Sequence, residues 1–148
     1  MTTTLTLQDH HEIGQLFARY GRCVDSGDAD GYIALFTEDG SFSRTNAIKQ
    51  GTGSGLPPAR FAGHKALHQL VKDIALQFQG KMRHQLTDIL IEPGEHDGQA
   101  KAVCYGLITD WREGAGKLSM HGTYRVSIVR TARGWKFKEV ALDRLPIE

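Results

Sequence analysis

Apolar and polar residues follow two different periods along this chain, one typical of helices and the other typical of β-strands. In residues 7–26 the apolar side chains recur every three to four positions, which places them on one face of a helix. The same spacing predicts a short second helix over residues 29–37 and a third over residues 63–78. The apolar face of the first helix is formed by Ile13, Leu16, Phe17, Tyr20, Cys23 and Val24.

The two ends of the first predicted helix carry residues suited to those positions. Thr6 can cap the helix, because its hydroxyl can accept a hydrogen bond from a free backbone N–H of the first turn. Asp9 places a negative charge in that turn, where the helix dipole favours it. Gly27 allows the left-handed turn with which many helices end.

After Gly80 the period changes to that of β-strands, and turn-length connections between the segments predict antiparallel pairing. A short strand is also expected at residues 41–43, and residues 46–62 form an irregular loop rich in glycine and proline. The order of elements predicts one α+β domain over residues 1–148, in which three helices pack on the concave side of a curved, mostly antiparallel sheet. The four long strands are expected at residues 82–92, 99–112, 117–130 and 135–142.

Composition and charge exclude several classes of function. The chain has 148 residues, 18 basic and 17 acidic, and a formal charge of +1, so it lacks the basic surplus that nucleic-acid binding requires. No apolar run approaches the roughly 20 residues that span a bilayer, and the first residues lack the features of a signal peptide. We therefore expect a cytoplasmic protein without nucleic-acid or membrane partners, in which Cys23 and Cys104 are reduced thiols.

Five segments, in order along the chain, resemble the nuclear-transport-factor-2-like (NTF2-like) superfamily and in particular its SnoaL-like branch. They are residues 13–25 (I-x-x-L-x-x-x-Y-x-x-x-V-D), 34–40, 83–91, 122–125 and 134–137. The resemblance implies an NTF2-like cone-shaped α+β barrel around an apolar pocket. Members include scytalone dehydratase, polyketide cyclases and ketosteroid isomerase, and also non-catalytic proteins such as dioxygenase β subunits. The fold therefore does not decide the function, which must be inferred from the residues of the site.

Asp25 and His84 match the aspartate and histidine that form a catalytic pair in the dehydratase and dehydrochlorinase members. A neutral imidazole can take a proton from a substrate near neutral pH, and a carboxylate on its other nitrogen fixes the tautomer and stabilises the imidazolium. Each residue also has a structural interpretation. By periodicity Asp25 falls at the edge of the apolar stripe and could be solvated, and His84 could be a hydrogen-bonded core histidine.

Three further polar residues are candidates to assist this pair. Tyr20 and His121 match residues that polarise a substrate oxygen in some dehydratase members, although Tyr20 could be a core tyrosine and His121 could point outward. Asp88 shares strand parity with His84 and would need a partner if it were buried. Candidates for binding substrate are Asp88, Tyr105, Tyr124 and Phe42.

These residues predict a lyase or isomerase of the dehydratase type, which acts on a small hydrophobic cyclic molecule and needs no cofactor. The alternatives are a polyketide cyclase, an enzyme like ketosteroid isomerase, or a non-catalytic binding module. His64 and His68 lie four residues apart on the third helix, but no further ligand accompanies them and no metal site is expected. The resemblance also implies a homodimer or homotrimer.

Overall fold

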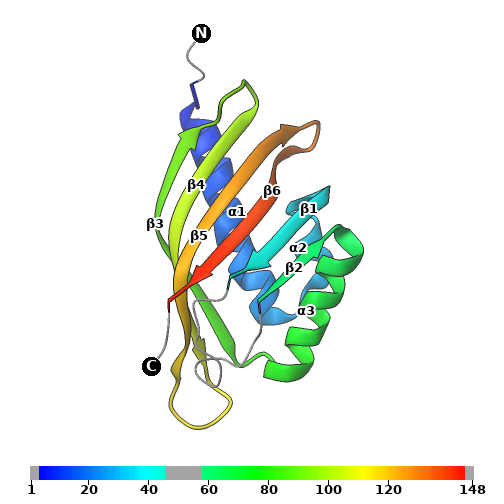
Figure 1. The fold of residues 1–148 in the computed structure, drawn as a ribbon, viewed down its shortest axis with the longest axis vertical. Helices are drawn as coiled ribbons and strands as arrows, with labels where there is room; N and C mark the ends of the chain where they lie inside the picture. The colour runs from blue at the N-terminus through cyan, green and yellow to red at the C-terminus, as the bar shows by residue number, and fades with distance from the viewer. Residues whose placement is uncertain (1–3, 46–57, 146–148) are drawn as a thin grey trace.

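The computed structural model describes residues 4–45 and 58–145, so most of the predicted loop lies outside the described residues. The described residues form three helices and six strands, which are arranged as in Figure 1. The helices are α1 (Leu7–Ser26), α2 (Ala29–Ile33) and α3 (His64–Phe78). The strands are β1 (Phe36–Arg44), β2 (Ala59–Ala62), β3 (Met82–Pro93), β4 (Gln99–Asp110), β5 (Lys117–Thr131) and β6 (Gly134–Arg144). None of the described helices is long and apolar enough to cross a membrane.

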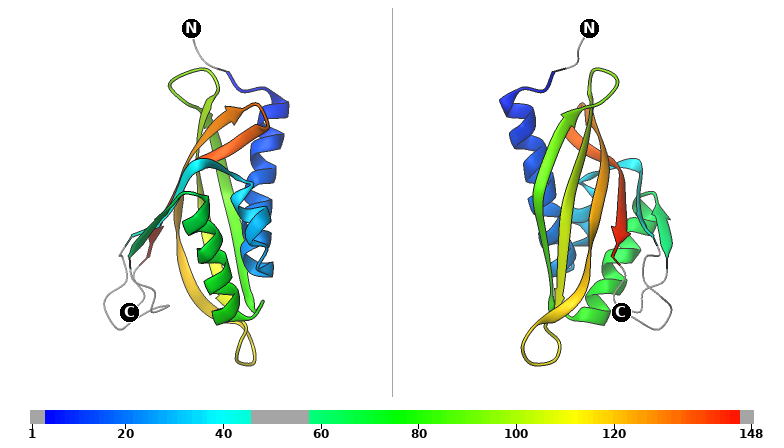
Figure 2. Two further views of the ribbon diagram at one scale, coloured as in Figure 1. Left: turned by 90° about the vertical axis from the view of Figure 1, so that its right-hand side faces the viewer. Right: turned by 60° about the vertical axis from the view of Figure 1, so that its left-hand side comes forward.

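All six strands belong to one curved sheet in the order β2-β1-β6-β5-β4-β3. The pairing of β1 with β6 is parallel, and the other pairings are antiparallel. The three helices pack against the inner face of this sheet, with α1 along β3 and α3 near β1 and β2 (Figures 1 and 2). This arrangement confirms the predicted α+β fold. It leaves β3 as an edge strand beside the end of α1.

The chain departs from the predicted elements between residues 29 and 44. The second helix ends at Ile33 rather than near residue 37, and a strand begins at Phe36 instead of at residue 41. Pairing with β6 explains the change, because Phe36 lies opposite Phe137 and the N–H of Phe137 donates to the carbonyl of Leu35 at 2.8 Å. This tertiary pairing overrides the local helical pattern. β2 likewise falls inside the segment expected to be irregular.

Asp9 caps α1 and also connects the start of this helix to the sheet through hydrogen bonds. Its carboxylate accepts from the backbone N–H of Thr6 at 2.8 Å, and the Thr6 hydroxyl accepts from the N–H of Asp9, which completes a capping box. The same carboxylate accepts from the Trp135 indole at 3.0 Å and from Arg130 at 2.8 Å. These contacts, led by the Thr6 backbone hydrogen bond, hold the pKa of Asp9 far below its usual range.

Loss of this carboxylate should lower the thermal stability of the protein and make that stability less dependent on pH in the acid range. Because the folded pKa of Asp9 lies below the 3.8 of a free carboxyl, its stabilising effect is full above that value and declines as the pH falls. We expect Asp9→Asn to lower the Tm by roughly 3–6 °C at pH 7. Between about pH 4 and pH 2, the Tm of this variant should fall less than the Tm of the wild type. Asp73→Asn, an exposed change on α3, is the control for scanning calorimetry. Equal acid sensitivity of wild type and Asp9→Asn would contradict this account.

Aromatic rings join α1 to the middle of the sheet. The ring of Phe137 lies 5.4 Å from that of Phe17, 6.0 Å from that of Tyr20 and 5.4 Å from that of Phe36, measured between centroids. All four side chains are buried. This packing fixes the rotation of α1 about its axis, and therefore the direction in which the last turn of the helix projects its polar side chains.

Candidate active site

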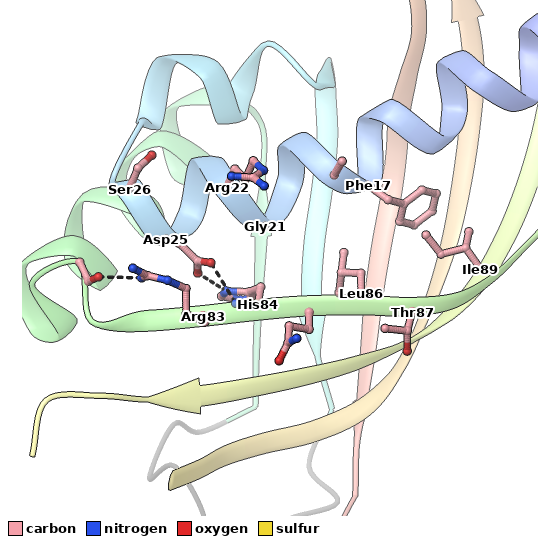
Figure 3. A pocket seen from close by; sticks show the side chains of 13 residues that line it. Phe17, Gly21, Arg22, Asp25, Ser26, Arg83, His84, Leu86, Thr87 and Ile89 are labelled. Carbon is pink, nitrogen blue, oxygen red and sulfur yellow. Dashed lines mark hydrogen bonds and ion pairs between the residues drawn. The ribbon is translucent and has the colours of Figure 1, made fainter. Parts of the chain in front are cut away.

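Asp25 and His84 form a tight, mostly buried pair between the last turn of α1 and the start of β3 (Figure 3). One Asp25 carboxylate oxygen lies 2.7 Å from Nδ1 of His84, and the other accepts from the backbone N–H of the same histidine at 2.9 Å. The side chains of His84 and Asp25 are only 7% and 13% exposed. The carboxylate therefore holds both the imidazole ring and the strand that carries it.

A glycine on α1 allows this close approach between helix and strand. Gly21 lies one turn before Asp25, and a Cβ atom added there would stand 3.2 Å from Cβ of His84 and 3.4 Å from its carbonyl oxygen. Because β3 is an edge strand, the N–H of His84 is available to α1. Gly21 thus sets the separation at which the Asp25 carboxylate can bind both the backbone N–H and Nδ1 of His84.

Two glycines of α1 allow a matched test of this spacing. Nothing lies within 4 Å of a Cβ built on Gly14, so Gly14→Ala should gain helix propensity and stabilise the protein by about 0.5–1 kcal/mol. Gly21→Ala gains the same propensity but pushes against His84, so we expect a lower Tm than for Gly14→Ala and a weakened contact between Asp25 and His84. Thermal melts and the NMR signal of the His84 ring N–H measure the two effects. Equal behaviour of the two variants would contradict this role for Gly21.

The hydrogen bond to Asp25 determines which nitrogen of His84 can act as a base. A carboxylate can only accept, so Nδ1 carries the proton and Nε2 keeps its lone pair. The two imidazole nitrogens point in divergent directions, so Nε2 is turned away from Asp25. Within the described part of the chain, no hydrogen bond involves Nε2. Nε2 is therefore the nitrogen at which the ring can take a proton.

A narrow cavity of about 40 Å³ lies on the inner side of His84, between the helices and the sheet. His84, three tyrosines and two methionines contribute to its wall: Tyr20, Tyr32, Tyr124, Met82 and Met120. The Tyr20 ring lies 6.3 Å from the His84 ring, 5.3 Å from Tyr32 and 5.9 Å from Tyr124. A ring-sized ligand requires more room. The unbranched methionine side chains can repack to supply it.

The three tyrosines of this cavity are hydrogen-bond donors rather than bases. Burial, which disfavours the phenolate, is the main reason that the pKa values of Tyr20, Tyr32 and Tyr124 lie above the usual range. The pKa of Tyr20 is also influenced by Tyr32 and Tyr124, whose rings lie 5.3 Å and 5.9 Å from its own. At neutral pH they remain protonated and can donate to an oxygen atom of a ligand. Burial also raises the pKa of the Cys104 thiol to about 12, so this thiol is not a nucleophile.

A second and larger hollow, an open groove of about 850 Å³, follows the outside of the pair between α1 and β3 (Figure 3). Polar and charged residues such as Arg22, Arg83 and Gln85 contribute much of its lining. The inner cavity is the better candidate for chemistry, because its wall combines His84 with three protonated tyrosines. Asp25 occupies Nδ1, so a proton can be transferred only at Nε2.

The structure brings together some of the predicted site residues and separates others. Tyr20, Tyr124 and Phe42 line the cavity with His84. Tyr105 is 51% exposed, because its neighbour Cys104, of opposite strand parity, is the buried one. His121 lies on the same outer face, with its ring 6.1 Å from that of Tyr105. Tyr105 and His121 therefore lie outside the cavity that His84 lines.

Asp88 also lies away from the cavity, for a different reason. The register between β3 and β4 shifts between Thr87 and Leu90, which marks a bulge with an extra residue in β3. Asp88 sits at this bulge with φ of 55° and is exposed. The alternation counted forward from His84 therefore fails at Asp88, and beyond the bulge Leu90 is 65% exposed.

Sequence reasoning missed two polar residues of the cavity wall, Tyr32 and Arg44, as well as its aliphatic residues. Tyr32 is 1% exposed on the short helix α2. Arg44 follows Phe42 by two positions on β1, so strand parity could have placed both side chains on the same face. A charged residue at the end of a strand gives no reason by itself to expect an inward direction.

The two histidines of α3 bind separate partners instead of sharing a ligand. Nε2 of His64 lies 3.1 Å from the carbonyl of Phe36, and Nε2 of His68 lies 2.9 Å from the Asp30 carboxylate. Among the described residues, no group of three or more histidine, cysteine, aspartate or glutamate side chains could hold a metal ion.

Comparison with known proteins assigns the chain to a family. Residues 5–141 match the SnoaL-like domain family, and the chain belongs to that family. An NTF2-like protein with a cystatin-like fold from Novosphingobium aromaticivorans is similar over 94% of this chain and 83% of its own, at 25% identity and a TM-score of 0.79. No curated protein sequence matches.

Two further structures share the fold at lower identity. A candidate scytalone dehydratase from the same bacterium is 21% identical, with a TM-score of 0.73 over 93% of this chain and 85% of its own. ActVI-ORFA from Streptomyces coelicolor is 22% identical, with a TM-score of 0.70 over 91% of this chain and 96% of its own. At these identities the likeness concerns the fold.

Proposed function

We propose that this protein is a lyase or isomerase that removes a proton from a small, mostly apolar cyclic substrate, with His84 as the base. The observation that carries the proposal is the pair of hydrogen bonds that His84 donates to Asp25, which leaves Nε2 as the unoccupied nitrogen of a histidine that lines a cavity with three tyrosines. The SnoaL-like family and the fold shared with a candidate scytalone dehydratase support a dehydration.

In the proposed dehydration, Nε2 of His84 takes a proton from the carbon next to a substrate carbonyl. Tyr20, which remains protonated, donates a hydrogen bond to the carbonyl oxygen, where negative charge develops. The electron pair of the broken C–H bond forms the new double bond as the C–O bond to the leaving hydroxyl breaks. The imidazolium, stabilised by Asp25, returns its proton to that hydroxyl, and water leaves. Return of the proton to another carbon would give an isomerisation instead.

One observation favours the alternative of a non-catalytic module that assembles with another protein, as a dioxygenase β subunit does. The cavity of about 40 Å³ is far smaller than the roughly 300–1,000 Å³ of most ligand sites, because the protein's own side chains fill most of the space. The Asp25–His84 pair favours the enzyme, since a packing role does not require a base with an unoccupied nitrogen beside tyrosine donors. Measurement of turnover decides between the two functions.

The test is a panel of cyclic β-hydroxy ketones, assayed for formation of the conjugated enone by absorbance and for uptake of deuterium from D2O by mass spectrometry. We expect turnover of at least one compound and a loss of about 10²–10⁴-fold in His84→Ala. His96→Ala, an exposed change in the turn after β3, should retain the wild-type rate. Absence of both elimination and deuterium uptake in the wild type, or full activity of His84→Ala, would overturn the proposal.

A further inference from the structure

A positively charged side chain forms part of the cavity wall that contains His84 and the tyrosines. Arg44, the last residue of β1, lines this cavity together with Tyr20 and Tyr124. Its guanidinium lies 5.5 Å from the centre of the Phe61 ring, a cation–π contact that orients the group. Burial is the main cause that lowers the pKa of Arg44, yet an arginine stays protonated at neutral pH.

A second arginine concentrates positive charge beside the first. Arg144 is 1% exposed at the end of β6, and its Nε donates to the carbonyl of Thr45 at 2.8 Å. Its charge also lowers the pKa of Arg44, after the larger effect of burial. Asp143, the acidic neighbour of Arg144 in the chain, binds Arg125 at 3.4 Å and the Thr45 hydroxyl at 3.0 Å.

From this placement we infer that the substrate carries an anionic group, a carboxylate or an ionised ring hydroxyl, which binds to Arg44 while the reacting carbon faces His84. The inference rests on the proposed function for the role of His84, and it names the class of substrate. A guanidinium has five N–H donors and can bind a carboxylate through two of them. The apolar and aromatic wall between Arg44 and His84 suits the ring of such a molecule.

The arrangement also explains why a charged residue is placed among apolar ones. Tyr20 borders both groups, since its ring lies 6.3 Å from that of His84 and it lines the same cavity as Arg44. A ligand anion bound by Arg44 would add charge-assisted hydrogen bonds to the apolar contacts of the ring. It would also fix the orientation of the ring, so that one C–H bond is presented to Nε2.

The experiment compares benzoate with benzyl alcohol, which have the same ring and differ in charge. NMR titrations that follow the ring signals of His84 and Tyr20 give the Kd of each probe. We expect benzoate to bind wild type at least about tenfold more tightly than benzyl alcohol. Arg44→Gln should remove that difference and leave the benzyl alcohol affinity unchanged. Arg60→Gln, an exposed change on β2, is the matched control and should behave as wild type.

Several results would overturn the inference: equal affinity for the two probes, absence of benzoate binding, or an equal loss in Arg60→Gln. The wild-type comparison needs no variant, so the test holds even if Arg44→Gln does not fold. Neither probe has a group to eliminate, so binding is measured apart from turnover. Charge-selective binding without turnover of any panel compound would refute the proposed enzyme but support the anion site at Arg44. Turnover of uncharged compounds, without preference for benzoate, would support the enzyme and refute the anion site.

Discussion

Asp25→Asn is expected to lower turnover by about 10³–10⁴-fold without unfolding the protein, because the ring proton of His84 should move from Nδ1 to Nε2. In the wild type, both oxygens of Asp25 accept from His84, one from the backbone N–H and one from Nδ1–H. An asparagine offers one oxygen and one NH2 group. The backbone N–H can only donate, so the oxygen must face it, and the NH2 group then faces Nδ1.

An imidazole ring can adapt to that change only by moving its own proton. With the NH2 group of the introduced asparagine donating to Nδ1, the proton of the neutral ring moves to Nε2, the nitrogen proposed as the base. His84 would then hold a proton where a base needs a lone pair. The ¹⁵N signals of the ring report the tautomer directly, and the panel substrate reports turnover.

Asp28→Asn is the matched control for this experiment. Asp28 caps α2 by accepting from the N–H of Gly31 at 2.9 Å, and asparagine caps helices about as well as aspartate. The same chemical change three residues away should leave the His84 tautomer and the rate unchanged. A wild-type tautomer in Asp25→Asn, or undiminished turnover, would show that the carboxylate does not set the state of the ring.

The periodicity of the chain was sufficient for most of the fold, because helix and strand patterns record which side chains face the core. α1 begins and ends at the predicted residues, and the cap at Thr6 and the turn at Gly27 were visible as residue types. The pattern failed where a distant strand decided the structure. Phe36 joins β1 because of its position opposite Phe137, about one hundred residues away, which no local spacing can show.

The site divides in the same way between local and distant causes. The family resemblance selected Asp25 and His84, and the structure brings them into contact. The alternation of Met120, Gly122 and Tyr124 against Ser119, His121 and Thr123 could have shown that His121 faces outward, because the first set is buried. The bulge at Asp88 has no such signal, since one extra residue in a strand leaves no mark on composition.

Phe137→Ala should lower the free energy of unfolding by about 3–5 kcal/mol, a large part of the roughly 5–15 kcal/mol that stabilises a domain. Phe137 is 1% exposed, and its ring contacts those of Phe17, Tyr20 and Phe36. Its removal would leave a cavity where α1 meets the sheet. Urea denaturation followed by circular dichroism measures the loss.

Tyr105→Ala provides the control, because it removes an aromatic ring from the same sheet on its exposed face. We expect less than about 1 kcal/mol for that change. Phe137→Leu, a smaller reduction that keeps the protein folded, should still lower turnover, since the Tyr20 ring rests against Phe137 at 6.0 Å and against His84 at 6.3 Å. Equal stability of Phe137→Ala and Tyr105→Ala would contradict the view that one aromatic cluster both holds α1 and positions Tyr20.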